Sequence, residues 1–336
     1  MSETGHEPER TALRSGRRAA VLLERYGGVI VLLAMIAVFS FLEPVNFPTY
    51  ENAVGILGSY AISGIVALGL LAPLAAGVFD LSIAGVMTLS VVGVTALFQS
   101  THGKFPVVLA VLCVLVGAIV VGMINGFLVL KIEVDPFIAT IGTSAVLVGM
   151  SQLIANGTTI VNNIPASFTN FGQANVGKIP VLVFVFAGLA LITWYLMTHT
   201  PFGPSLYATG AAREATRLAG IRTTRIIVLG FCSSALGAAI AGVLFAAQSG
   251  SGPPSVGDGY LLGAYAAAFL GSTMIRPGRF NVGGLIVALL IVGVGVNGLQ
   301  QVGLPFWVIE TFQGSALLLA VALGKLGRRT TSAAHA

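Results

Sequence analysis

The sequence predicts an all-α polytopic membrane protein with about ten transmembrane helices, some of them broken or tilted, and with both termini in the cytoplasm. Three observations lead to this prediction. Of the 336 residues, 56% are hydrophobic and only 9% are charged, whereas a soluble domain has about 25% charged residues. The apolar residues form runs long enough to cross a hydrocarbon layer about 30 Å thick. The 43 glycines allow close contact between helices in a bilayer.

Each long apolar run predicts one span. The predicted spans lie at residues 27–42, 53–78, 80–99, 105–130, 136–155, 179–198, 226–248, 259–275, 281–302 and 306–323. The first run lacks a small-residue cleavage site, so we expect a retained helix rather than a signal peptide. The chain therefore divides into a cytoplasmic N-terminal tail (1–26), one transmembrane domain (27–323) and a cytoplasmic C-terminal tail (324–336).

The positive charges predict the orientation of these spans. Of the seventeen Lys and Arg residues, fifteen fall in segments on one side of the predicted membrane, and only Lys104 and Lys178 fall on the other. The side rich in Lys and Arg is the cytoplasmic one. Both termini then lie inside, which requires an even number of spans. We attribute the net charge of +5 to this orientation and expect no nucleic-acid partner.

Two connecting segments are longer than the other turns. The outer one, 156–178, is rich in Asn, Thr and Gly, and it is either a solvated surface loop or a docking surface for an extracytoplasmic protein. The inner one, 203–225, predicts a short helix over about 211–219 that ends at Gly220. Glu214 and Arg217 are spaced to pair along this helix. The inner segment is either a plain connector or a contact for another protein.

Sequence signals for catalysis are missing from this chain. A P-loop needs Ser or Thr after Gly-Lys, but the three Gly-Lys pairs are followed by Phe105, Ile179 and Leu326. The four histidines have no Cys or carboxylate at ligand spacing. We interpret Cys113 and Cys232 as small residues within apolar runs. We therefore expect a protein that is not an enzyme, with no cofactor and no metal of its own.

One carboxylate interrupts the apolar sequence in "LAAGVFDLSIAG" (74–85). Asp80 is the only Asp, Glu, Lys or Arg between Glu51 and Lys104. Pro73 and Gly77 argue against one continuous helix, because proline removes a backbone hydrogen bond and glycine loosens the turn. Asp80 then lies where the next helix begins, and it either caps that helix through amides near Ser82 and Ile83 or contacts a solute or gate.

The other polar residues within the predicted spans are uncharged amides and hydroxyls. They are Asn125, Thr140, Thr143, Ser144, Gln152, Ser233, Ser234, Gln248, Asn297, Gln300 and Gln301. Each can serve a contact between helices, but together they suit a path for a neutral polyhydroxylated solute rather than for an ion. The candidate residues of this solute path are Asp80, Ser82, Asn125, Thr140, Thr143, Asn297 and Gln300.

Four motifs in order resemble those of the permease subunits of bacterial ABC sugar importers, the ribose/xylose/arabinose class. "GVFDLSIAG" (77–85) resembles the motif G-G-x-D-L-S-x-G, and "VDPFIATIGT" (134–143) is similar to P-F-I-A-T-L-G-T. "YATGAAREATRLAGI" (207–221) resembles the cytoplasmic coupling loop, and the segment 269–299 resembles a glycine-rich stretch that ends in N-G-L. The resemblance covers roughly residues 50–323 of the chain.

This resemblance implies a function and a set of partners. It implies ten spans, two permease copies side by side in the lipid membrane, a cytoplasmic ATPase that binds ATP and Mg²⁺, and an extracytoplasmic solute-binding protein. The residues that would contact the ATPase are Arg213, Glu214, Ala215, Arg217, Leu218 and Gly220. The expected function is alternating-access import of a monosaccharide or related polyol across the bacterial cytoplasmic membrane.

The chain departs from the family pattern at two places. Leu261, Leu262 and Gly263 stand where relatives often have acidic residues, and Gln300 and Gln301 replace the usual Asn-Leu. Two alternatives therefore stay open. The solute could be another small molecule, such as a branched-chain amino acid, or the chain could be a secondary carrier driven by an ion gradient. Such carriers need ionisable partners within the membrane, and only Asp80 qualifies clearly.

Overall fold

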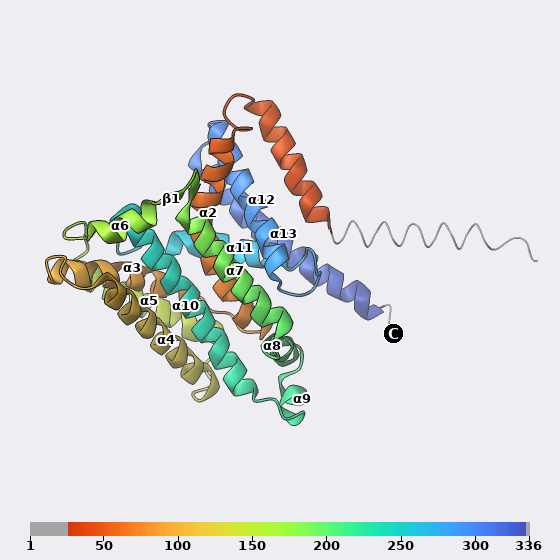
Figure 1. The fold of residues 1–336 in the computed structure, drawn as a ribbon. Coiled ribbons are helices and arrows are strands. Elements are labelled where there is room, and N and C mark those ends of the chain that lie inside the picture. Colours follow the sequence, from red (N-terminus) through yellow and green to blue (C-terminus); the bar gives the residue numbers. More distant parts are fainter. Residues whose placement is uncertain (1–25, 334–336) are drawn as a thin grey trace, which may run out of the picture.

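The computed structural model describes residues 26–333, and most of this range is helical (Figure 1). After a first helix, Tyr26–Leu42, the elements are α2 (Tyr50–Ala75), α3 (Ile83–Ser100), α4 (Val107–Leu130), α5 (Pro136–Ala155), α6 (Ala166–Gln173), β1 (Asn175–Val176), β2 (Ile179–Pro180), α7 (Val181–His199), α8 (Phe202–Ala211), α9 (Arg213–Leu218), α10 (Thr223–Ser249), α11 (Asp258–Gly271), α12 (Val282–Gln301) and α13 (Phe306–Ala333). The two short strands pair antiparallel, with Asn175 opposite Pro180.

The prediction of a polytopic all-α membrane protein is confirmed. Within residues 26–333, seven helices are long and apolar enough to cross a membrane, namely α2, α3, α4, α5, α7, α10 and α12. The other three predicted spans coincide with two shorter apolar helices, Tyr26–Leu42 and the Trp307–Ala322 part of α13, and with the 14-residue α11. The count of ten spans stays a prediction. Helix α13 continues beyond residue 323, the predicted end of the last span, while the predicted N-terminal tail lies outside the described residues except for Tyr26.

Helices α2 and α10 form the centre of the molecule and cross at two glycines. A Cβ atom on Gly237 would lie 2.9 Å from the Cα of Gly69, so the two backbones touch where only glycine fits. Of the most apolar 18-residue stretch of α2, 61% is buried, whereas only 17% of the corresponding stretch is buried in α4 and in α7. Most side chains of α4 and α7 are therefore exposed, as expected for outer helices of a membrane bundle.

The two central helices each end at a break. The first break, 76–82, separates α2 from α3, and the second, 250–257, separates α10 from α11. Each begins near a glycine with positive φ, Gly77 (78°) and Gly250 (61°). The packing is also paired: α10 packs on α3 and α4, while α2 packs on α11 and α12. The predicted interruption between α2 and α3 is confirmed, and it has a counterpart in the second half of the chain.

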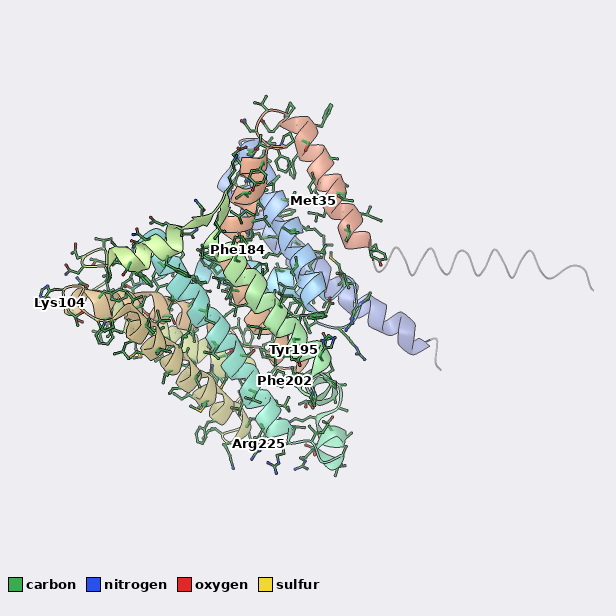
Figure 2. All side chains as sticks on the ribbon, in the orientation of Figure 1. Met35, Lys104, Phe184, Tyr195, Phe202 and Arg225 are labelled. Carbon is green, nitrogen blue, oxygen red and sulfur yellow. The ribbon has the colours of Figure 1, made fainter. Side chains whose placement is uncertain are left out.

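The predicted inner and outer segments lie at opposite ends of the bundle. Figure 2 places Lys104 at one end and Arg225 at the other. At the Lys104 end, the Lys178 ammonium lies 5.6 Å from the ring centroid of Tyr50. At the Arg225 end, the Arg279 guanidinium lies 5.3 Å from the ring centroid of Tyr207. This separation of Lys104 and Lys178 from the arginines agrees with the predicted orientation.

The segment 156–178 is more ordered than a solvated loop. It contains α6, whose Phe168 is buried against Phe98 of α3 with ring centroids 5.2 Å apart. The Gln173 side chain donates a hydrogen bond of 3.0 Å to the carbonyl of Gln248 at the end of α10. The composition of this segment did not predict the helix, because most of its residues are polar or small and the sequence does not show that Phe168 packs into the core.

Candidate functional site

The break after α2 arises from Pro73 and Gly77. Because Pro73 lacks an N–H, the last turn of α2 loses one hydrogen bond to the preceding turn. The Gly77 amide donates to the Leu74 carbonyl at 3.1 Å, and the Val78 amide donates to the Pro73 carbonyl at 3.0 Å. These two bonds with a left-handed glycine form a Schellman motif, which ends a helix. The chain then turns back toward the interior and places Asp80 between α2 and α3.

Asp80 is completely buried and accepts three hydrogen bonds. The Ser82 amide donates to its Oδ1 atom at 3.0 Å, and the Ser82 hydroxyl donates to the same atom at 2.5 Å. The Ser234 hydroxyl of α10 donates to Oδ2. The expected bond from an amide near Ser82 is therefore present, but the other two donors are hydroxyls. Asp80 thus connects the break to α10 through Ser234, and it also binds Ser82, the residue that directly precedes α3.

The hydrogen bonds at Asp80 continue into α4 and α5. The Asn125 amide nitrogen donates to the Ser82 hydroxyl oxygen at 2.8 Å, and the Thr143 hydroxyl donates to the Asn125 amide oxygen at 2.7 Å. The Thr140 hydroxyl accepts from the Leu81 amide at 3.1 Å. Helix α11 joins through Tyr265, whose hydroxyl accepts from the Asp80 amide at 3.1 Å. The sequence did not predict this tyrosine.

This arrangement brings together five of the seven candidate residues for the solute path. Asp80, Ser82, Asn125 and Thr140 have no exposed surface, and Thr143 is partly buried. In this conformation their polar atoms bind one another and the backbone. We call these five residues together with Ser234 and Tyr265 the Asp80 network. A solute could reach its fully buried members only if the surrounding helices moved.

Asn297 and Gln300 lie elsewhere, at a cavity of about 340 Å³ between α2, α11, α12 and α13. Its lining consists of Ile56, Ser59, Tyr60, Ser63, Gly259, Tyr260, Gly263, Leu289, Val292, Val296, Asn297, Gln300 and Gln313. Hydroxyl and amide groups make up the polar part of this lining, and no Asp, Glu, Lys or Arg is among these residues. A volume near the lower end of the usual range for ligand pockets, about 300–1,000 Å³, suits a small ligand.

A neighbouring side chain holds Asn297 in position. The Gln301 amide nitrogen donates to the Asn297 amide oxygen at 3.2 Å and to the Asn52 amide oxygen at 2.8 Å. The sequence singled out Asn297 and Gln300 but not the serines and tyrosines of the lining. Ser59 and Ser63 are one helical turn apart on α2, so their i,i+4 spacing was the signal that could have revealed this polar face.

The cytoplasmic segment 203–225 forms two helices instead of the single one expected. Helix α9 covers most of the predicted 211–219, but Ala211 belongs to the preceding α8, and Ala212 separates the two with an extended φ of −155°. The predicted end at Gly220 is confirmed, because the Gly220 and Ile221 amides donate to the Arg217 and Thr216 carbonyls in a Schellman motif.

Helix α9 presents most of its side chains to solvent. The predicted pair is present, with Arg217 and Glu214 2.7 Å apart, but both side chains are exposed, so the pair contributes only about 0–1 kcal/mol. Arg213 and Ala215 are exposed as well, and Leu218 is 84% exposed. An exposed apolar side chain beside charged groups at one end of the bundle suits a contact with another protein.

Comparison with known proteins identifies the family of this chain. The model of the family described as "Branched-chain amino acid transport system / permease component" matches residues 52–322. The chain belongs to this permease family. The match begins at the start of α2 and ends within α13, so it includes the Asp80 network, the cavity and α9.

Several relatives of this permease are named as sugar transport proteins. The ribose import permease protein of Escherichia coli K12 is 31% identical over 91% of this chain and 96% of its own length. The D-allose transport system permease protein of the same strain is 31% identical over 91% and 93%, and its L-arabinose counterpart is 28% identical over 96% and 95%. No solved structure matches the chain.

Two further observations complete the description of this permease. Within residues 26–333, no group of three or more His, Cys, Asp or Glu side chains could hold a metal ion. A second, larger hollow of about 690 Å³ lies between α3, α4 and α5, and most of its lining side chains, such as Leu89, Val114 and Val121, are apolar. This hollow is less suited to a polyhydroxylated solute than the cavity that contains Asn297.

Proposed function

We propose that this chain is the membrane-spanning subunit of an ABC importer that moves a monosaccharide or related polyol across the bacterial cytoplasmic membrane. The observation that supports the proposal most directly is the cavity between α2, α11, α12 and α13, because its lining combines amides and hydroxyls with no charged side chain. Neutral donors and acceptors match sugar hydroxyls. The printed names of the ribose, D-allose and L-arabinose relatives agree with this solute class.

The mechanism would be alternating access driven by a partner. In this proposal a cytoplasmic ATPase binds ATP and Mg²⁺ and contacts α9 through Arg213, Ala215 and Leu218. A solute-binding protein delivers the sugar at the opposite end, which is formed by the 156–178 segment. A second copy of the chain, or a relative, completes the membrane unit.

The two alternatives are less well supported. The charged ends of a zwitterionic amino acid are favoured by groups of opposite charge, and the cavity lining has no charged side chain of either sign. An ion-driven carrier needs ionisable groups that can exchange a proton or an ion within the membrane. Asp80 is buried, and the groups that donate to its carboxylate are the Ser82 amide and the hydroxyls of Ser82 and Ser234, so none of these partners is an acidic or basic side chain.

Transport in reconstituted vesicles tests the proposal. The chain would be inserted with the ATPase and binding protein of its own organism, and uptake of ribose, allose, arabinose and leucine would be measured with and without internal ATP. We expect uptake of a sugar that requires ATP and survives an ionophore. Gln300→Leu should weaken uptake, whereas Gln99→Leu, at the exposed outer end of α3, serves as the matched control. Leucine uptake, or sugar uptake abolished by the ionophore without loss of ATP, would contradict the proposal.

A further inference from the structure

Tyr207 of α8 connects the cytoplasmic segment to the turn between α11 and α12. Its hydroxyl donates a hydrogen bond to the Phe280 carbonyl, and the Arg279 guanidinium lies 5.3 Å from its ring centroid. Burial raises the pKa of the Tyr207 hydroxyl from its ordinary value, although Arg279 and Arg276 act in the opposite direction. The hydroxyl therefore keeps its proton at neutral pH and stays a donor to Phe280.

Helix α8 is also connected to α9. The buried Thr216 of α9 donates its hydroxyl to the Ala208 carbonyl at 2.8 Å, next to Tyr207 in the chain. On its other side, α8 lies against the first break, since a Cβ atom on Gly210 would be 2.3 Å from the Ala75 carbonyl oxygen. The Thr216 bond thus joins α9 to α8 beside the single residue, Ala212, that links them, and the Gly210 contact joins α8 to the first break.

Aromatic rings continue the connection from Phe280 to the interior. The Phe280 ring meets the edge of Phe269 on α11 with centroids 5.5 Å apart. Phe269 stacks at 6.2 Å on Tyr265 and at 6.1 Å on Phe79. Tyr265 belongs to the Asp80 network, and the same helix α11 contributes Tyr260 and Gly263 to the cavity. Packed rings at these spacings attract one another in addition to the effect of their burial.

We propose that Tyr207 is a positioning residue for transport, which fastens α8 to the 279–280 turn so that movement of α9 shifts α11 and α12 together. The proposal rests on the proposed function, because it assumes that an ATPase moves α9. Without the Tyr207 bond, α8 would still follow α9, but the turn between α11 and α12 would follow less closely. The cavity would then respond weakly to the ATPase, and the ATPase would respond weakly to the solute.

The test uses the complete importer in vesicles, with the ATPase and the solute-loaded binding protein. Tyr207→Phe removes one oxygen atom and keeps the ring under Arg279. We expect the ratio of stimulated to basal ATP hydrolysis to fall about fivefold, as a bond worth about 1 kcal/mol implies. Basal hydrolysis per bound ATPase should stay unchanged, which a loss of folding would not produce. Tyr195→Phe, an exposed ring stacked on His199 of α7, is the matched control and should behave as the wild type.

The outcomes separate the two proposals. If wild-type importer is stimulated and Tyr207→Phe is stimulated to the same ratio, the positioning role of Tyr207 is wrong and the proposed function stands. If wild-type chain binds no ATPase, or its ATPase ignores the loaded binding protein, both proposals are overturned. Arg279→Gln provides a second variant, since it removes the cation above the ring and leaves the hydroxyl bond. We expect it to lower the same ratio by about two- to fivefold, and an unchanged ratio in both variants would also refute the positioning role.

Discussion

Substituting Asp80 tests whether its network holds the broken helices together. In Asp80→Leu the Ser82 amide and the Ser82 hydroxyl lose their common acceptor within the buried site. Each buried donor without a partner costs about 1–3 kcal/mol, so the variant should lose about 2–6 kcal/mol of unfolding free energy. Ser234 contributes less to this loss, because the Phe231 carbonyl, 2.9 Å away, offers its hydroxyl a second acceptor.

Asp80→Asn should be much milder. The asparagine oxygen can still accept both bonds from Ser82, and its amide can donate to the Ser234 hydroxyl once that hydroxyl turns to Phe231. The bonds remain but become weaker, because hydrogen bonds to a neutral group contribute less than those to a charged one. We therefore expect a loss of at most about 2 kcal/mol of unfolding free energy. Asp258→Leu removes an exposed acidic side chain at the start of α11 and should change stability by about 0.5 kcal/mol or less.

Unfolding of the three variants would be followed in mixed micelles with increasing denaturing detergent, alongside uptake in vesicles. Equal stability of Asp80→Leu and the wild type would refute the structural role, and so would an Asn variant as unstable as the Leu variant. A third result has a separate meaning. If Asp80→Asn folds with normal stability but no longer transports, Asp80 acts on the solute or the gate, and its hydrogen bonds are only part of its role.

Two further predictions concern the ends of the bundle. Ser100 ends α3 shortly before Lys104, and Asn170 belongs to α6, which lies at the same end of the bundle (Figure 1); both are exposed. Cysteines at these two positions should react with an impermeant maleimide added outside intact cells, whereas Leu218→Cys on α9 should react only after the membrane is opened. Outside labelling at 218 would refute the orientation. Ala215→Trp should leave the chain inserted in the membrane but abolish stimulation of ATP hydrolysis, because the added ring would hold α9 away from the ATPase. Arg213→Ala should have only a modest effect, because charged contacts at the rim of an interface change the association rate more than the affinity. Normal stimulation in Ala215→Trp would show that α9 is only a connector.

The fold was largely predictable from hydropathy, and the reasons are physical. A lipid solvent forces backbone groups to bond within each segment, so long apolar runs can only be helices. Proline and glycine then mark where such a helix must stop, as Pro73 and Gly77 do at the end of α2. These constraints act within a few residues of each other, and a sequence displays them directly. The short helix α6 lacks such a signal, because it is fixed by Phe168 packing on a ring seventy residues earlier in the chain.

The candidate site was predictable only in part, since its contacts join distant parts of the chain. Asp80 was conspicuous as an isolated charge, but its partner Ser234 is 154 residues away in the chain. Tyr265, whose hydroxyl accepts a hydrogen bond from the Asp80 amide, is 185 residues away. Nothing in the local pattern distinguishes Ser234 from Ser233, whose hydroxyl bonds the Gly69 carbonyl instead. Hydroxyls on apolar helices often bond their own backbone, so residue type alone does not reveal which of them face a partner.

Three of the five departures from the sugar-importer pattern lie at or beside one cavity. Gly263 and Gln300 come from separate sequence motifs, yet both line the 340 Å³ cavity, and Gln301 orients Asn297 beside them. The remaining two departures differ in environment, because Leu261 packs against the core while Leu262 is 38% exposed. By contrast, Asp80 and Ser82 lie in the motif that matches the family pattern. Asp80 and Ser82 thus belong to the break and its hydrogen bonds, whereas Gly263 and Gln300 belong to the lining of the cavity. We therefore expect residues 263 and 300 to determine solute preference. Substituting these two residues should change which sugar is transported without destabilising the Asp80 network.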